Sequence, residues 1–168
     1  DANCSQCHQP GGTGPTFDAR YDTPLASQNI IYGALDPGAD NVAMVVPHDI
    51  WRSEMYQRAA SLAPGVQMPP LAKNLLDTNA LAVIAAWINS LPGTPALAPP
   101  AITPDGGTFT TSVNVALQST NGGDTLYYTL DGSLPTTNSF RYAGPFNLFS
   151  NAIVAASAFE TSYNNSVA

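Results

Sequence analysis

The feature that most constrains this chain is a pair of cysteines followed directly by a histidine, close to its N-terminal end. The run Cys4-Ser5-Gln6-Cys7-His8 contains both cysteines of the 168-residue chain and one of its two histidines. This C-x-x-C-H spacing is that of covalent c-type haem attachment, in which two thioether bonds fix the porphyrin to one helical turn. The adjacent imidazole then lies under the iron. The motif therefore predicts one covalent haem c, held by Cys4 and Cys7, with His8 as the proximal iron ligand.

Two other uses of paired cysteines are weighed against haem attachment. A structural zinc site needs a second pair of ligands, and His48 is the one remaining good candidate. A thioredoxin-like dithiol requires an upstream βαβ pattern, whereas only residues 1–3 precede Cys4. Haem attachment is the interpretation for which the sequence contains every required residue, namely two cysteines and the histidine that follows them.

A second axial ligand is expected from the segment Gln67-Met68-Pro69-Pro70-Leu71. The two prolines restrict the backbone, so that the Met68 thioether is presented with little conformational freedom to lose. We expect Met44 and Met55 to be core residues, because methionine usually fills apolar interiors. His48 remains an alternative sixth ligand.

The proximal histidine needs a hydrogen-bond acceptor for its second ring nitrogen. The run Gly11-Gly12-Thr13-Gly14-Pro15 is suited to this role, because glycines let the backbone pass close to a haem. We expect a carbonyl near Pro15 to accept from His8.

Residues 1–92 carry the helical signals. A short helix is expected over 22–35, and a second from His48 or Asp49 to about Ser61. The clearest signal is a third helix, capped by Asp77 or Thr78 and ended by Pro92-Gly93. Its apolar residues follow the i, i+3, i+4, i+7 spacing of an amphipathic helix: Leu81, Ile84, Ala85 and Ile88.

Residues 93–100 are rich in proline and are predicted to be an extended, semi-rigid linker. The composition then changes to Thr, Ser, Asn and Gly, and three segments alternate between apolar and polar residues. Their apolar positions are Val113, Val115 and Leu117; Leu126, Tyr128 and Leu130; and Val154, Ala156 and Ala158. The predicted fold class is therefore two domains, a small all-α domain at 1–92 and an all-β sandwich at 101–168.

The charge balance limits the possible partners. Lys and Arg total 5 against 12 Asp and Glu, a net charge of −7, so binding to nucleic acid or to an anionic membrane surface is not expected. No apolar run approaches the ~20 residues of a membrane-spanning helix. A signal peptide is also absent from the sequence, and we expect that one has been removed.

The first part of the chain resembles a mono-haem class I cytochrome c domain over residues 4–91. The matching residues are Cys4-x-x-Cys7-His8, Gly14-Pro15, Met68-Pro69-Pro70-Leu71 and Trp87-Ile88. The resemblance implies a small all-α cytochrome c fold, with His8 as proximal and Met68 as distal ligand. The stretches 17–22 and 45–56 are similar to cytochrome modules attached to bacterial quinoprotein sugar dehydrogenases. Class I domains begin with a helix before the motif, so we expect this chain to be a fragment of a longer polypeptide.

Residues 99–168 resemble the immunoglobulin-like domain found at the C-terminus of chitobiase and β-hexosaminidase. The matching runs are Ile102 to Phe109, Leu126 to Pro135 and Tyr142 to Phe146. Such domains are accessory spacers in exported proteins, and the resemblance implies no catalysis. Tyr127 and Tyr142 are considered as sugar-binding residues, but packing within the sandwich is the expected role.

These expectations favour an extracytoplasmic electron carrier, in the periplasm or on the surface of a bacterium. A His/Met-ligated haem suits outer-sphere electron transfer with a dehydrogenase, another cytochrome or a membrane redox complex. The alternative is a structural or surface-assembly subunit in which the β-domain makes the contacts and the haem is secondary. An enzyme such as a haem peroxidase, or a ligand sensor, would require that Met68 leave the iron open.

Overall fold

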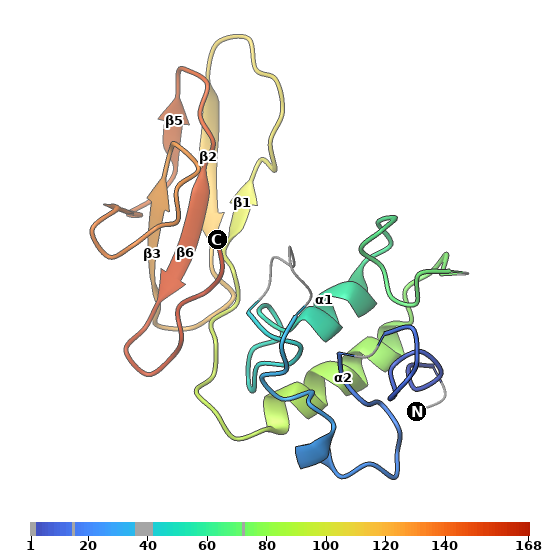
Figure 1. Cartoon of the computed structure of the whole chain (residues 1–168). Coiled ribbons are helices and arrows are strands. Elements are labelled where there is room, and N and C mark those ends of the chain that lie inside the picture. Colours follow the sequence, from blue (N-terminus) through green and yellow to red (C-terminus); the bar gives the residue numbers. More distant parts are fainter. Residues whose placement is uncertain (1–2, 15, 36–41, 72) are drawn as a thin grey trace. The chain divides into compact units, whose positions relative to one another are not determined.

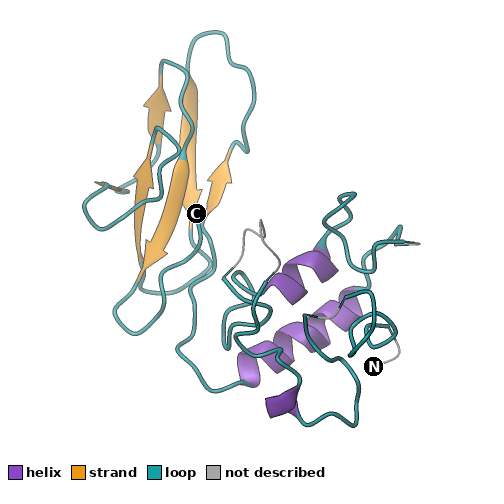
Figure 2. Ribbon diagram, in the orientation of Figure 1, coloured by secondary structure: helices purple, strands orange, loops and turns teal. Residues whose placement is uncertain are grey.

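The computed structural model describes residues 3–14, 16–35, 42–71 and 73–168. The chain divides into two compact units, an N-terminal unit, Asp1–Gly93, and a C-terminal unit, Thr94–Ala168. Within the described ranges, both α-helices belong to the N-terminal unit and the paired strands of the sheets to the C-terminal unit (Figures 1 and 2). None of the helices found in these ranges is both long and apolar enough to cross a membrane.

The expected small all-α domain is wrong. The N-terminal unit contains two short helices, α1 (Glu54–Ala60) and α2 (Thr78–Ser90), and one 3-10 turn, η1 (Leu25–Ser27). Loops and isolated bridges make up the rest of its described residues (Figure 2). Most of the described residues of the N-terminal unit therefore lie outside helices, and no all-α cytochrome c fold is present in the described part.

Helix α2 confirms the strongest helix prediction. The Asp77 carboxylate accepts a hydrogen bond from the Ala80 amide at 2.9 Å, which satisfies one of the free N–H groups of the first turn. The helix ends before Leu91 and Pro92, and its Ile88 is fully buried. Helix α1 contacts α2, so the two helices share one packing face.

The helix expected over 22–35 is wrong, and the backbone shows why. Asn29 and Tyr32 have positive φ angles of 54° and 52°, which no α-helix accepts. The Tyr32 amide donates to the Val45 carbonyl at 2.9 Å, and the Val45 amide donates to the Ile30 carbonyl at 3.1 Å. The apolar side chains around Ile30 and Ile31, which suggested a helical face, are thus positioned by backbone pairing with the segment at Val45.

The second predicted helix begins later than expected. Asp49 does act as a capping residue, since its Oδ1 accepts the amides of Trp51 and Arg52 at 3.0 and 2.9 Å. The helix nevertheless starts only at Glu54, because the Glu54 and Met55 amides donate to the carbonyls of residues 43 and 44. Long-range pairing therefore takes the donors that an earlier helical start would have used.

An apolar core forms among the described residues of the N-terminal unit. Its buried members are Phe17, Ile30, Met44, Val45 and Ile88. Side chains from both helices pack against this cluster, so α1, α2 and the loops that carry the buried residues all contact the same core.

The C-terminal unit is a β-sandwich of two three-stranded antiparallel sheets. One sheet has the order β1 (Ala101–Thr103), β2 (Val113–Gln118), β5 (Phe146–Leu148). The other has the order β4 (Phe140–Arg141), β3 (Thr125–Thr129), β6 (Ala155–Phe159). Buried side chains from β2, β3 and β6 meet between the sheets, which confirms the strand predictions in these three segments.

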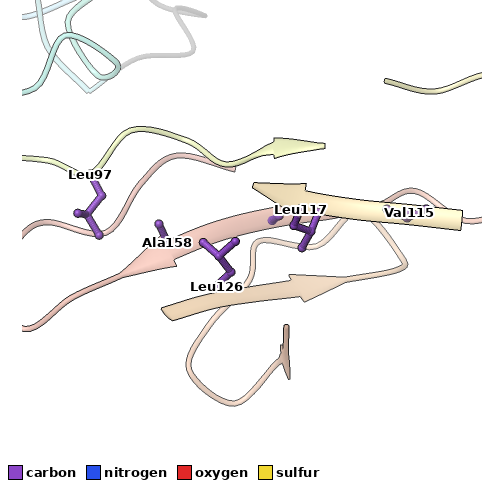
Figure 3. Close-up of a cluster of buried hydrophobic side chains, with 6 residues drawn as sticks. Leu97, Val115, Leu117, Leu126 and Ala158 are labelled. Carbon is purple, nitrogen blue, oxygen red and sulfur yellow. The ribbon is translucent and has the colours of Figure 1, made fainter. Parts of the chain in front are cut away.

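Residues 94–98, within the predicted linker, are hydrogen-bonded into this sandwich. The Leu97 amide donates to the Asn164 carbonyl at 3.0 Å, and the Asn164 amide donates to the Pro95 carbonyl at 2.9 Å. Asn121 binds both backbone groups of Ala98. The Leu97 side chain is 2% exposed and belongs to the core cluster with Leu126 and Ala158 (Figure 3).

Candidate functional site

The C-x-x-C-H motif forms a single helical turn. The His8 amide donates to the Cys4 carbonyl at 2.8 Å, and the Cys7 amide reaches the same oxygen at 3.2 Å. Both thiols are free and exposed. The two sulfurs and the imidazole of His8 therefore project from one turn of backbone, which is the arrangement that two-point attachment of a planar group requires.

The His8 ring is enclosed by two neighbours. Phe17 stacks on it with ring centroids 4.1 Å apart and an interplanar angle of 20°. A Cβ atom added at Gly14 would lie 2.7 Å from Cε1 and 2.8 Å from Nδ1 of the ring, so a larger residue there would have to displace the ring. The Ala19 amide also donates to the His8 carbonyl at 2.8 Å. These contacts hold the imidazole in one orientation.

The segment behind the motif is braced by a buried carboxylate. Asp18 is 8% exposed and accepts two hydrogen bonds from the Arg20 side chain, at 2.6 Å from Nη2 and 3.0 Å from Nε. Thr23 Oγ1 donates to the same carboxylate at 2.9 Å. The hydrogen bonds from Arg20 in particular hold the pKa of Asp18 well below its ordinary value. Asp18 is thus an ionised anchor directly after Phe17.

Met68 lies on a loop that is tied to the end of α1. It is half-buried, and its amide donates to the Arg58 carbonyl at 2.9 Å. The Met68-Pro69 peptide bond is cis. Arg58 also reaches over the loop, with its Nε donating to the Val66 carbonyl at 2.7 Å. Met68 is therefore held by backbone contacts from a helix, not by burial alone.

The remaining candidate ligands have other places in the fold. Met44 is buried and Met55 packs against the N-terminal core, which confirms their expected roles. His48 has a φ of 59°, and its amide donates to the Ile88 carbonyl at 3.0 Å, near the C-terminal end of α2. Among the described residues, no three His, Cys, Asp or Glu side chains gather as a metal cluster. The expected acceptor near Pro15 lies outside the described residues.

The predicted residues thus fall into two groups joined through one core. Cys4, Cys7 and His8 share a turn, and Phe17 connects that turn to the core beside Ile88 of α2. Met68 belongs to a separate loop, which is connected to the same core through α1.

The residues of the N-terminal unit fit a haem. The donor set is two free thiols, an imidazole and a thioether, which are the groups that attach and ligate haem c. A haem is also a large and mainly apolar ring that needs apolar side chains around it. The segment that contains Met68 and leads into α2 exposes such side chains: Leu62, Val66, Leu71, Leu75, Leu76 and Val83.

Sequence reasoning missed two features. Lys73 and Arg58 bind the carbonyls of the Met68 loop, and the only signal was that Lys73 is the chain's single lysine. A cleft of about 650 Å³ opens at one end of the sandwich, between the loop 104–112 and the loop 149–154. No sequence pattern marks this cleft.

The tyrosines considered for sugar binding are packing residues. Tyr142 lies against the sandwich core, and its hydroxyl accepts the Leu117 amide at 3.1 Å. Tyr127 meets Phe159 edge to face, with ring centroids 5.4 Å apart. Both rings thus stabilise the sandwich.

Comparison with known proteins bears on the C-terminal unit. Residues 104–168 match the family model described as the chitobiase/beta-hexosaminidase C-terminal domain. This match fits the two antiparallel sheets and their shared core, and supports an immunoglobulin-like β-sandwich that is similar to this family. Searches of curated proteins and of solved structures found no significant match to the chain.

Proposed function

We propose that the N-terminal unit carries one covalently attached haem c and that the protein transfers single electrons outside the cytoplasmic membrane. The observation that carries the proposal is the turn at residues 4–8. It presents two free, exposed thiols, and the imidazole that follows them is packed against Gly14 and Phe17. A histidine that served only as a surface residue would not need this enclosure.

Each residue has a separate task in this proposal. The thiols of Cys4 and Cys7 would hold the haem through two thioether bonds. His8 and Met68 would supply the two protein ligands of its iron. When bound, the haem supplies an iron that gains and loses one electron. Two protein ligands leave no open position for a substrate, so the protein acts as an electron carrier and not as an enzyme.

The first experiment is export of the full chain in a bacterial host that attaches haem c. The expected product keeps its haem after denaturation, and the Cys4→Ala/Cys7→Ala double variant does not. The ferric spectrum of the wild-type protein is expected to show the weak near-infrared band of methionine–iron ligation. Met68→Leu should abolish this band, whereas the matched control Met55→Leu, in the core, should retain it.

The opposite results have distinct meanings. A chain that loses all its haem on denaturation contradicts covalent attachment. A wild-type spectrum without the near-infrared band contradicts ligation by Met68. Carbon monoxide binding to the reduced protein then distinguishes the two remaining states, since only an open iron binds it readily and a His48-ligated iron does not.

The proposed partners are redox proteins: a dehydrogenase, another cytochrome or a membrane redox complex. The chain has a net charge of −7, which favours a partner with a basic docking patch. The second-order rate of electron exchange with such a partner should fall as ionic strength rises. A rate that is independent of salt would contradict docking by charge.

A second candidate function is assembly on a surface, with the β-sandwich making the contacts. It is favoured by the family match and by exposed aromatic and aliphatic side chains on the sandwich, Phe149 and Ile153, which are 77% and 70% exposed. Gradient sedimentation of the native protein tests it. A native complex that Phe149→Ser releases would support assembly, and a native monomer would contradict it.

A further inference from the structure

The single lysine of the chain joins two parts of the Met68 loop. Lys73 Nζ donates to the Met68 carbonyl at 3.1 Å and to the Ser61 carbonyl at 2.9 Å. It also donates to the carbonyl of Ala59, and to that of Arg58 at 3.4 Å. One ammonium group therefore binds both the start of the loop and the residue proposed as the distal ligand.

The position of this ammonium suits its charge. The last carbonyls of a helix have no partners within the helix, and they form the negative end of its dipole. Helix α1 ends at Ala60, so Lys73 satisfies carbonyls at and beyond its last turn. A neutral side chain of similar length supplies neither the charge nor three donors.

The loop lacks the apolar burial that holds other parts of the unit. Leu62 is 45% exposed and Val66 is 49% exposed. The contacts that remain are polar: the Met68 amide on the Arg58 carbonyl, the Arg58 guanidinium on the loop carbonyls, and Lys73. Removal of Lys73 therefore takes away a large part of what fixes the loop.

We infer that Lys73 is a positioning residue that keeps the Met68 thioether on the haem iron against competing ligands. This inference rests on the haem function proposed above. Thioether sulfur is a neutral, weakly bound ligand, so its occupancy depends on how firmly the protein backbone holds it in place. An external ligand such as imidazole must displace the loop before it reaches the iron. A loop that is held less firmly needs less free energy to be displaced, so an external ligand then binds more tightly.

The test compares imidazole binding to the oxidised, full-length protein in four forms: wild type, Lys73→Gln, Lys73→Arg and Arg141→Gln. Lys73→Gln should bind imidazole at least about tenfold more tightly, because it loses charged hydrogen bonds to carbonyls. Lys73→Arg keeps the charge and should recover part of the difference. Arg141→Gln removes the same charge from an exposed strand of the other unit, and should stay within about twofold of wild type.

A second measurement separates positioning from general stability. Both tryptophans, Trp51 and Trp87, lie in the N-terminal unit, so their fluorescence follows its unfolding. Lys73→Gln should raise the rate of thermolysin cleavage within 62–71, under conditions in which the tryptophan signal remains that of the folded protein. This readout is independent of the iron.

The outcomes distinguish the inference from the function on which it rests. A wild-type protein without haem, or without the near-infrared band, overturns the proposed function. A wild type with that band, together with a Lys73→Gln variant of unchanged imidazole affinity, overturns the inference alone. A Lys73→Gln variant whose imidazole affinity rises only where the unit unfolds also overturns it.

Discussion

Replacement of Leu97 by alanine tests whether the proline-rich stretch is part of the C-terminal sandwich. Leu97 is 2% exposed and packs in the core with Leu126 and Ala158. The substitution removes three carbon atoms, which is worth about 2 kcal/mol in transfer free energy at ~0.8 kcal/mol per methylene. The cavity adds to this, so we expect the free energy of unfolding to fall by about 3 kcal/mol. The amide hydrogen bond to Asn164 remains possible in the variant.

The assay is urea unfolding of the full chain, followed by far-UV circular dichroism for the sheets and by tryptophan fluorescence for the N-terminal unit. For a slope near 1 to 1.5 kcal/mol per molar, the midpoint of the β-transition should fall by roughly 2 to 3 M. The tryptophan transition should not move. Leu134→Ala is the matched control, since this leucine is 78% exposed and its loss should change stability by no more than about 0.5 kcal/mol. Equal midpoints for the two variants would refute the reasoning.

Three further predictions follow from single contacts. Asp18→Asn should destabilise the N-terminal unit at pH 7, and the wild-type advantage should begin to decrease below about pH 4, near the pKa of an unfolded Asp, and be lost only as the pH falls through the lowered pKa of folded Asp18, because its stabilisation depends on ionisation; tryptophan-monitored acid titrations of both proteins check this. Gly14→Ala should displace the His8 ring and lower the fraction of chains that carry haem, measured as haem per polypeptide. Tyr142→Phe should cost about 1 to 3 kcal/mol in urea unfolding, because the Leu117 amide loses its acceptor; an unchanged midpoint would show that water replaces the hydroxyl.

Local signals predicted those elements whose cap or apolar periodicity can be read within the element itself. Helix α2 needs only its own turns and the Asp77 cap, and both are visible in the sequence. Strand β2 likewise has alternating Val115 and Leu117 on its buried face. The prediction failed where distant segments compete for donors. The amide of Glu54 bonds to residue 43, and that of Tyr32 to Val45, and neither pairing has a periodic signature.

The sequence located the turn and the loop of the candidate site, and did not locate the contacts that support them. The cysteine spacing identified the turn at 4–8, and the prolines identified the loop of Met68. Nothing in the sequence indicated that Phe17 would stack on His8, or that Lys73 would bind the Met68 carbonyl, because both contacts depend on how loops cross. Loop residues carry no periodicity from which such crossings can be inferred.

The enclosure of the imidazole also has a consequence for finding similar modules in other genomes. In this chain the ring packs against a glycine six positions after the histidine and an aromatic residue three positions later. The short pattern C-x-x-C-H occurs by chance in many unrelated chains. The longer sequence pattern C-x₂-C-H-x₅-G-x₂-F, which runs from Cys4 to Phe17, includes the residues that contact the imidazole and should match far fewer unrelated chains by chance.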